Sequence, residues 1–266
     1  MLDKVNSIDH ISRDKFPKRI ICLVPSLTEL LYDLNLEEEV VGITKFCEFP
    51  PHFRKTKVLI GGTKNIKLER IKELKPDLII CNKEENTEEI ISDLLPVAPI
   101  YLCDVKNLKD NSLVIGQIGK ICGRNTEASN LIQKINFELN DFQTFLKGQN
   151  QGHKVAYFIW YQPWMAAGSD TFIQSMLEIN KFENIYSNKE RYPSVEPKKI
   201  RLEGDPEVIF LSSEPFPFGD KHAFELGRFT HHAKTVFVDG SYFSWYGSRV
   251  SKSIQYFKKL QLELNS

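Results

Sequence analysis

The sequence lacks both a net charge and a long apolar run. Its 266 residues include 35 Lys plus Arg and 35 Asp plus Glu, so the formal net charge is zero. A balanced charge disfavours nucleic acid and anionic membrane surfaces as partners. No apolar run approaches the roughly 18 residues that a transmembrane helix requires. The composition, with 41% hydrophobic and 26% charged residues, is typical of a globular chain of one or two domains.

The N-terminus also lacks the apolar segment of an export signal. Residues 1–19 read MLDKVNSIDHISRDKFPKR and are mostly polar or charged. A secretory signal needs an apolar stretch of about 7–15 residues after its basic start. The sequence therefore leaves two alternatives open: a precursor from which a signal was removed, or a chain that stays in the cytoplasm.

Motifs for catalysis, nucleotide binding and metal binding are missing as well. There is no P-loop, no GxSxG turn and no GxGxxG between a strand and a helix. The histidines do not show metal-ligand spacing on a predicted helix, and no nucleophile–base set is evident. The five cysteines, none in a CxxC pair, are Cys22, Cys47, Cys81, Cys103 and Cys122. We predict buried free thiols, no metal site, no intrinsic cofactor and no enzymatic activity.

What the sequence does contain is an alternation of β-rich runs and amphipathic helical patterns. This alternation predicts an α/β fold of βαβ units with mostly parallel sheets. Ser26 and Glu29 have the spacing of a capping box, which predicts a helix over 27–36. The predicted strands cover 19–24, 40–44, 58–60, 78–81, 100–102, 154–159, 208–211 and 236–238. The other predicted helices cover 68–74, 87–95, 108–121, 126–147, 171–180 and 248–262.

The longest predicted helix, over 126–147, divides the chain into two halves. At about 1.5 Å per residue it is long enough to connect two lobes. Residues 71–80 and 200–210 resemble each other, because each is a helix end, a Pro-acid turn and an aliphatic strand. We predict two Rossmann-like lobes bridged by one long helix. The predicted boundaries are 1–107, 108–151 and 152–266.

Aromatic residues cluster in segments that follow the predicted strands of the second half. Trp160 and Trp164 follow one strand, Phe216 and Phe218 another, and residues 242–246 a third; all three tryptophans lie in these segments. Loops at the carboxyl ends of parallel strands form the ligand crevice of α/β proteins. The aromatic segments therefore predict a site for a large flat ligand, although core packing beneath loops is the alternative.

Several motifs resemble a known family. The chain is similar to class III substrate-binding proteins of ABC importers for cobalamin, ferric siderophores and haem. Cobalamin-binding members show the closest resemblance. The motifs that carry the resemblance, over about residue 17 to the end, are RIICLVPSLTE at 19–29, VGI at 41–43, FPP at 49–51, GGT at 61–63, LERIKELKPDLII at 68–80, AGSDTF at 167–172, ENIY at 183–186, DPEV at 205–208 and Arg249.

The resemblance implies a ligand held in a cleft between two rigidly bridged lobes. The site residues that it and the aromatic pattern predict are Phe46, Trp160, Trp164, Tyr192, Phe243, Trp245, Tyr246 and Arg249. The expected ligand is cobalamin, a ferric siderophore or haem. A tryptophan of the cobalamin-binding relatives falls in the segment 61–64, which lacks one here.

The resemblance also implies an ABC permease partner and a monomeric protein in the periplasm or facing outward. Family members dock through one glutamate on each lobe, and Glu69 matches the N-lobe position. The C-lobe position falls on Lys198, with Glu196 two residues earlier. A cytoplasmic carrier or sensor of a metal chelate, without a transporter, is the alternative; an enzyme is the least favoured hypothesis.

Overall fold

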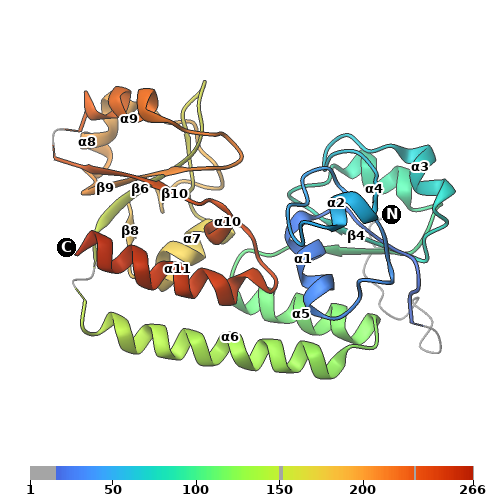
Figure 1. Cartoon of the computed structure of the whole chain (residues 1–266). Helices are drawn as coiled ribbons and strands as arrows, with labels where there is room; N and C mark the ends of the chain where they lie inside the picture. The colour runs from blue at the N-terminus through green and yellow to red at the C-terminus, as the bar shows by residue number, and fades with distance from the viewer. Residues whose placement is uncertain (1–15, 150–151, 231, 266) are drawn as a thin grey trace. The chain divides into compact units, whose positions relative to one another are not determined.

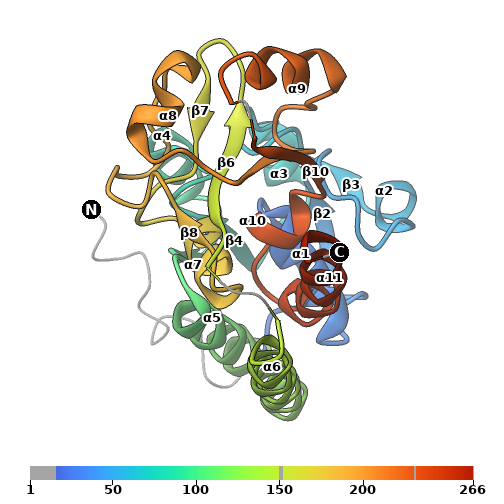
Figure 2. The same ribbon diagram turned by 90° about the vertical axis from the view of Figure 1, so that its left-hand side faces the viewer.

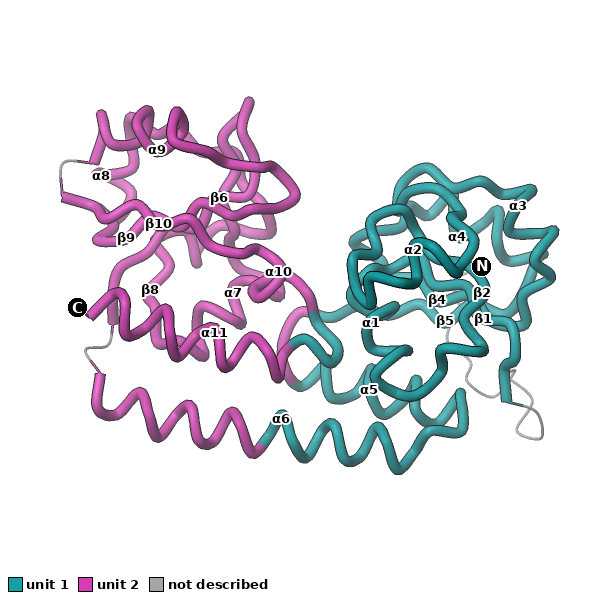
Figure 3. The backbone as a smooth tube through the Cα atoms, viewed as in Figure 1, with its two compact units in different colours: residues 1–105, 109–136, 246–249 teal, residues 106–108, 137–245, 250–266 magenta. Residues whose placement is uncertain are grey.

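The computed structural model describes residues 16–149, 152–230 and 232–265. The chain forms two compact units, which Figure 3 distinguishes by colour. Unit 1 comprises residues 1–105, 109–136 and 246–249. Unit 2 comprises residues 106–108, 137–245 and 250–266. The predictions made for residues 1–15 fall outside the described residues.

Unit 1 is built on a five-stranded sheet of order β3-β2-β1-β4-β5, in which every neighbouring pair is parallel. Its strands are β1 (Ile20–Cys22), β2 (Val40–Ile43), β3 (Val58–Leu59), β4 (Leu78–Asn82) and β5 (Ile100–Cys103). The strand order reverses at β1, which is the topological switch point of a doubly wound sheet. The predicted parallel α/β lobe is confirmed here.

Most helices of unit 1 begin and end close to the predicted positions, but the short helix Phe53–Thr56 was not predicted. The helices are α1 (Pro25–Asp33), α2 (Phe53–Thr56), α3 (Leu68–Glu73), α4 (Glu88–Leu94) and α5 (Leu108–Ile121). The predicted capping box is wrong, because α1 begins at Pro25 and its N-cap, Val24, has no side-chain hydrogen bond. Proline suits the first helical turn, since its missing N–H would have had no partner there.

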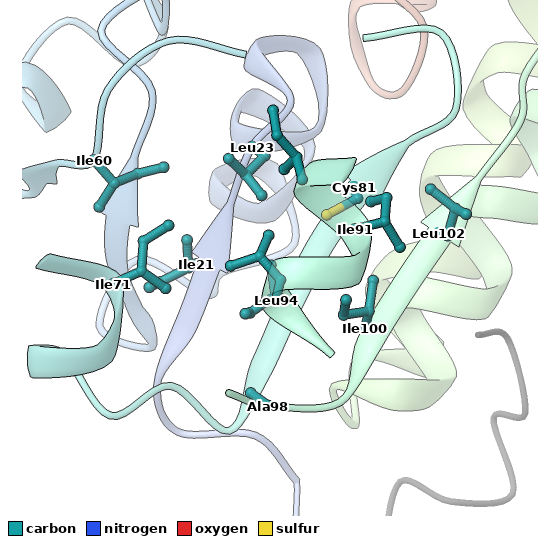
Figure 4. Packing of buried hydrophobic residues seen from close by; sticks show 12 residues of the cluster. Ile21, Leu23, Ile60, Ile71, Cys81, Ile91, Leu94, Ala98, Ile100 and Leu102 are labelled. Carbon is teal, nitrogen blue, oxygen red and sulfur yellow. The ribbon is translucent and has the colours of Figure 1, made fainter. Parts of the chain in front are cut away.

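The core of unit 1 lies where α3 and α4 cover one face of the sheet. Alternate strand residues such as Ile21, Leu23, Ile79 and Cys81 point to this face, as the twofold period of a strand requires. They pack against apolar side chains of the two helices. The labelled side chains in Figure 4, which include Ile71, Ile91 and Leu94, show this packing from close by.

Unit 2 contains a second five-stranded sheet with the order β10-β9-β6-β7, and β8 also pairs with β6. Its strands are β6 (Lys154–Trp160), β7 (Met165–Ala166), β8 (Glu183–Asn184), β9 (Val208–Ser212) and β10 (Lys234–Val238). The pairs β10–β9, β9–β6 and β6–β8 are parallel, whereas β7 runs antiparallel to β6. The second α/β lobe is therefore also as predicted.

Helices lie on both faces of this second sheet. They are α7 (Phe172–Ile179), α8 (Ile200–Glu203) after the short 3₁₀ helix η3 (Pro197–Lys199), α9 (Asp220–Gly227), α10 (Ser241–Ser244) and α11 (Arg249–Leu264). Figure 1 shows α8 and α9 on one side of the sheet and α7, α10 and α11 on the other. The sequence analysis did not predict α9 or α10.

The long helix α6 (Asn125–Leu146) agrees with the prediction to within one residue at each end. Its residues up to Asn136 belong to unit 1 and those from Phe137 onward belong to unit 2. Among the residues that the structure describes, no helix is both long and apolar enough to cross a membrane. The predicted domain boundaries and the bridging role of this helix stay predictions.

Candidate functional site

The carboxyl ends of β6, β9 and β10 lie along one edge of the unit 2 sheet, because these strands are parallel neighbours. β6 ends at Trp160, β9 at Ser212 and β10 at Val238. The aromatic segments 160–164, 216–218 and 242–245 each follow one of these strand ends. Figure 2 offers a second view of β6, β10 and the neighbouring α9. We call this edge, with its three following segments, the aromatic edge.

Trp160 is the most exposed of the predicted ligand residues on the aromatic edge. Its side chain is 40% exposed, which is high for an indole in a folded protein. Its ring meets Phe216 edge to face, with the ring centroids 5.6 Å apart. An aromatic face supported from behind by another ring is suited to stacking on a flat ligand.

Behind this surface, two aromatic donors share one carboxylate. The Tyr161 hydroxyl donates a hydrogen bond of 3.1 Å to Oε2 of Glu225, and Trp164 Nε1 donates one of 3.1 Å to Oε1. Donation to the carboxylate raises the pKa of the Tyr161 hydroxyl, and desolvation adds to the effect. Trp164 is buried against Phe218, with the rings stacked at 5.5 Å.

His222 fills the space beneath the same rings. The centroid of its imidazole lies 4.8 Å from that of Tyr161, 5.1 Å from that of Phe216 and 5.3 Å from that of Phe218. Its Nδ1 accepts a hydrogen bond of 3.0 Å from the backbone N–H of Gly219, so the ring is fixed to the start of α9. His222 and Glu225 have i, i+3 spacing on α9, which the sequence analysis missed because it predicted no helix there.

The third aromatic segment is held by a second glutamate. Trp245 Nε1 donates a hydrogen bond of 2.9 Å to Oε1 of Glu214, and the same oxygen accepts one of 2.6 Å from the Ser244 hydroxyl. Phe243 is 0% exposed, and its ring packs 4.8 Å from that of Phe257 and 5.0 Å from that of Tyr157. These contacts are those of a core residue, so ligand contact by Phe243 stays a prediction without an exposed surface to support it.

In unit 1, one exposed ring is found among the described residues that follow the strands. Phe46 follows β2 and is 50% exposed. An added Cβ at Gly62 would lie 3.0 Å from this ring, so the ring lies close to the glycine backbone. The Lys45 ammonium lies 5.0 Å from the centroid of the same ring. Phe46 and Lys45 together present an apolar face beside a positive charge.

Arg249, predicted to face the ligand, is instead buried within unit 1. Its Nε donates to Oε2 of Glu29 at 2.7 Å, and the two side chains are 3% and 2% exposed. Its guanidinium lies 4.1 Å from the ring centroid of Phe49, which is within the range of a cation–π contact. The arginine therefore occupies a structural position, and contact with a ligand stays a prediction.

Tyr246 is buried beside the thiols of unit 1. Its hydroxyl lies 4.0 Å from Sγ of Cys103, and burial raises its pKa well above the ordinary value. All five cysteines are free and buried, as predicted. Burial raises the pKa of the Cys103 and Cys122 thiols to about 12, so these groups stay protonated at neutral pH.

A pocket of about 210 Å³ lies in unit 1 beside β5 and α5. Tyr101, Asp104 and Gln117 are among the residues that line it, and the Tyr101 hydroxyl donates a hydrogen bond of 2.6 Å to Gln117. None of the predicted ligand residues lines this pocket. Among the described residues, no cluster of three or more His, Cys, Asp or Glu side chains could hold a metal ion.

The remaining predicted residues lie on the surface or near it. Glu69 is in the first turn of α3 with its side chain 80% exposed, and it pairs with Lys72 at 2.7 Å. Glu196 pairs with Lys199 at 2.8 Å, which lowers the pKa of the glutamate. Tyr192 is half-buried, with the guanidinium of the preceding arginine 5.6 Å from its ring centroid. Their docking and ligand roles stay predictions.

Comparison with known proteins decides the family. The family model described as "Periplasmic binding protein" matches residues 20–228, most of the chain. The chain belongs to the periplasmic binding protein family. Its members are binding proteins, which agrees with the prediction that the chain is not an enzyme. The predicted resemblance to periplasmic substrate-binding proteins is thereby confirmed.

Curated relatives of this periplasmic binding protein include a vitamin B12-binding protein of Pectobacterium carotovorum. It is 25% identical over 243 residues, which cover 90% of this chain and 86% of the relative. An ABC transporter substrate-binding lipoprotein of Bacillus subtilis is 28% identical over 177 residues, covering 64% of this chain and 56% of the relative. Both relatives are named as binding proteins.

Solved structures show the same fold. A periplasmic haem-binding protein from Roseiflexus matches with a TM-score of 0.81 at 16% identity, covering 94% of this chain and 99% of that one. The periplasmic vitamin B12-binding protein of Vibrio cholerae matches with a TM-score of 0.78 at 20% identity, covering 93% and 98%. The predicted fold class, two α/β lobes of the class III type, is therefore confirmed.

Proposed function

We propose that this periplasmic binding protein holds a corrinoid or a ferric chelate, such as a siderophore complex or haem, and delivers it to an ABC importer. The observation that carries the proposal is the aromatic edge of unit 2, where Trp160 is 40% exposed and meets the ring of Phe216 edge to face. Relatives named for vitamin B12 binding and structural neighbours named for haem binding support this class of ligand.

Binding rests on the burial of apolar ligand surface against rings. Trp160 supplies one ring in unit 2, and Phe46, 50% exposed, supplies one in unit 1. Burying apolar area contributes about 25 cal/mol per Å², so two large rings account for a substantial part of the affinity. The Lys45 ammonium beside Phe46 suits a carboxylate or another anionic group of the ligand. The protein itself supplies no metal ligand in this proposal.

Incubation of the purified protein with cobalamin, cobinamide, haem and ferric siderophores tests the ligand class. Absorbance retained after desalting reports the bound chelate directly. We expect one of these ligands to be retained in about one equivalent. Retention of none of them contradicts the proposed function.

The importer role places the protein in the periplasm or on the outward-facing side of a membrane, as a monomer that docks on a permease. Glu69 is the proposed docking residue of unit 1, and its side chain is 80% exposed. In unit 2, Glu196 is the proposed counterpart, because the resemblance implies that Lys198 falls at the position of the docking glutamate.

Uptake of the chelate by cells that carry Glu69→Lys tests the docking role. We expect lower uptake with unchanged ligand binding, because the carboxylate lies on the surface and pairs with Lys72 of the same helix. Glu73→Lys is the matched control, because Glu73 is an exposed glutamate at the other end of the same helix. Unchanged uptake with Glu69→Lys contradicts the transporter role.

A further inference from the structure

The aromatic edge depends on one carboxylate that belongs to none of the predicted site residues. Glu225 lies on α9, and each of its two oxygens accepts a hydrogen bond from a different aromatic side chain of the segment after β6. Tyr161 Oη and Trp164 Nε1 are the donors, both at 3.1 Å. Hydrogen bonds to a charged acceptor are stronger and more directional than those between neutral groups.

The two donors flank the turn that begins at the exposed indole. Trp160 directly precedes Tyr161 in the chain, and Trp160 and Tyr161 both contact Phe216, at 5.6 and 5.8 Å between centroids. Any rotation of the Tyr161 side chain therefore changes the packing of the ring that supports Trp160. His222, one turn before Glu225 on α9, fills the space below and limits the alternative positions of these rings.

We propose that Glu225 is a positioning residue, which fixes Tyr161 and Trp164 and thereby sets the orientation in which Trp160 meets the ligand. The proposal rests on the proposed function for the identity of the ligand, but the geometry of the segment can be tested without one. It also implies that Trp164 uses its indole N–H for the protein and not for the ligand. Glu214 does the same for Trp245, at 2.9 Å.

Labelling with 5-fluorotryptophan makes the orientation visible. The chain has 3 tryptophans, so a ¹⁹F spectrum has three resonances, which single Trp→Phe variants assign. In Glu225→Gln, the amide oxygen can accept from only one of the two donors, so the Trp164 and Trp160 resonances should both shift. The Trp245 resonance should not move, because its acceptor is Glu214. A Trp160 resonance unchanged in Glu225→Gln, beside a shifted Trp164 resonance, overturns the proposal.

Affinity for the retained chelate provides the second readout. We expect Glu225→Gln to weaken binding about tenfold and Glu225→Ala to weaken it further, since alanine leaves both donors without an acceptor. Glu178→Gln is the matched control, because Glu178 is an exposed glutamate of unit 2 that accepts a hydrogen bond of 2.9 Å from Gln174. Affinity should be normalised to the folded fraction, measured by circular dichroism.

The combined outcomes separate this proposal from the proposed function. If no chelate is retained but the Trp160 resonance shifts in Glu225→Gln, the positioning role stands and the ligand class is wrong. If a chelate is retained and Glu225→Gln binds it as tightly as the wild type per folded molecule, the positioning role is wrong and the function stands. A lower melting temperature with normal affinity indicates a structural role only and also overturns the proposal.

Discussion

The two lobes use the same edge of the same kind of sheet in different ways. In unit 1, thiol and amide contacts hold the segments that follow the strands: Cys47 donates to the Thr28 hydroxyl at 3.2 Å, and Asn86 donates to the Thr63 carbonyl at 2.9 Å. In unit 2, large rings follow the strands, and glutamates hold them. A parallel sheet thus fixes where a site lies, whereas the residues after each strand decide its chemistry.

The difference teaches that charged side chains serve different ends in the two lobes: the pair in unit 1 is buried, whereas the glutamates of unit 2 are partly exposed. The Arg249–Glu29 pair of unit 1 is buried, and the guanidinium lies over the half-buried ring of Phe49. Glu214 and Glu225 of unit 2 instead accept hydrogen bonds from the indoles of Trp245 and Trp164, in segments that follow the strands. The ion pair thus stabilises the interior of unit 1, whereas the two glutamates of unit 2 fix the orientation of aromatic side chains.

Breaking the buried ion pair of unit 1 should have the largest effect on stability. Glu29→Ala leaves the Arg249 guanidinium charged and buried, which costs about 3–5 kcal/mol. Urea unfolding followed by circular dichroism measures the loss. Glu69→Ala, which removes an exposed pair, is the control and should cost less than about 1 kcal/mol. Equal losses for the two variants would show that the burial of the pair has no energetic consequence.

Within unit 2, the loss of a core ring should lower the free energy of unfolding much more than the loss of a surface ring. This difference should be nearly as large as the one in unit 1. Phe243→Ala removes a ring that is 0% exposed and should cost about 3–5 kcal/mol of the free energy of unfolding. Trp160→Ala removes a ring that is 40% exposed, and the free protein should lose about 1 kcal/mol or less. Thermal unfolding of both variants without ligand tests the contrast, which fails if Trp160→Ala is the more destabilising change.

Alkaline pH should destabilise unit 1 more than unit 2, because all five thiols belong to unit 1. Folding raises the pKa of Cys103 and Cys122 to about 12, whereas an unfolded thiol titrates near about 8.5. A raised folded-state pKa gives stability that is complete below the unfolded value and is lost as pH rises toward the folded value. Stability to urea should therefore fall between about pH 8.5 and 12.

Cys122→Ala sharpens this test, since it removes one of the buried thiols. The variant should lose less stability than the wild type between pH 8 and pH 10, each compared with itself at pH 7. Tryptophan fluorescence reports unit 2, and thiol reactivity toward an aromatic disulfide reports unit 1. An identical alkaline loss in the variant would mean that the thiol pKa has no part in it.

Much of this fold could be predicted because its signals are local. The sequence shows the apolar runs of β1 and β4 directly, and it also shows the 22 residues of α6 as one long helical pattern. The sequence also predicted that the aromatic segments after β6 and β9 lie at one edge of the sheet, because neighbouring parallel strands have their carboxyl ends at the same edge. The predicted capping box was wrong because α1 begins at Pro25, which is earlier than the Ser26–Glu29 spacing indicates.

The parts that could not be predicted depend on contacts between distant residues. Arg249 and Glu29 are 220 positions apart, so no pattern in the sequence links them. Helix α9 is short and largely polar, and without it the HxxE spacing of His222 and Glu225 has no structural meaning. Family resemblance pointed to Arg249 as a cleft residue but could not indicate that its guanidinium is paired inside unit 1.

The central claim is that the aromatic edge of unit 2 contributes more to ligand binding than Phe46 of unit 1. Isothermal titration of the retained chelate into wild type, Trp160→Ala and Phe46→Ala tests it most directly. We predict that Trp160→Ala weakens binding by about 1–3 kcal/mol and Phe46→Ala by less. Wild-type affinity in Trp160→Ala, or a larger loss in Phe46→Ala, would contradict the account.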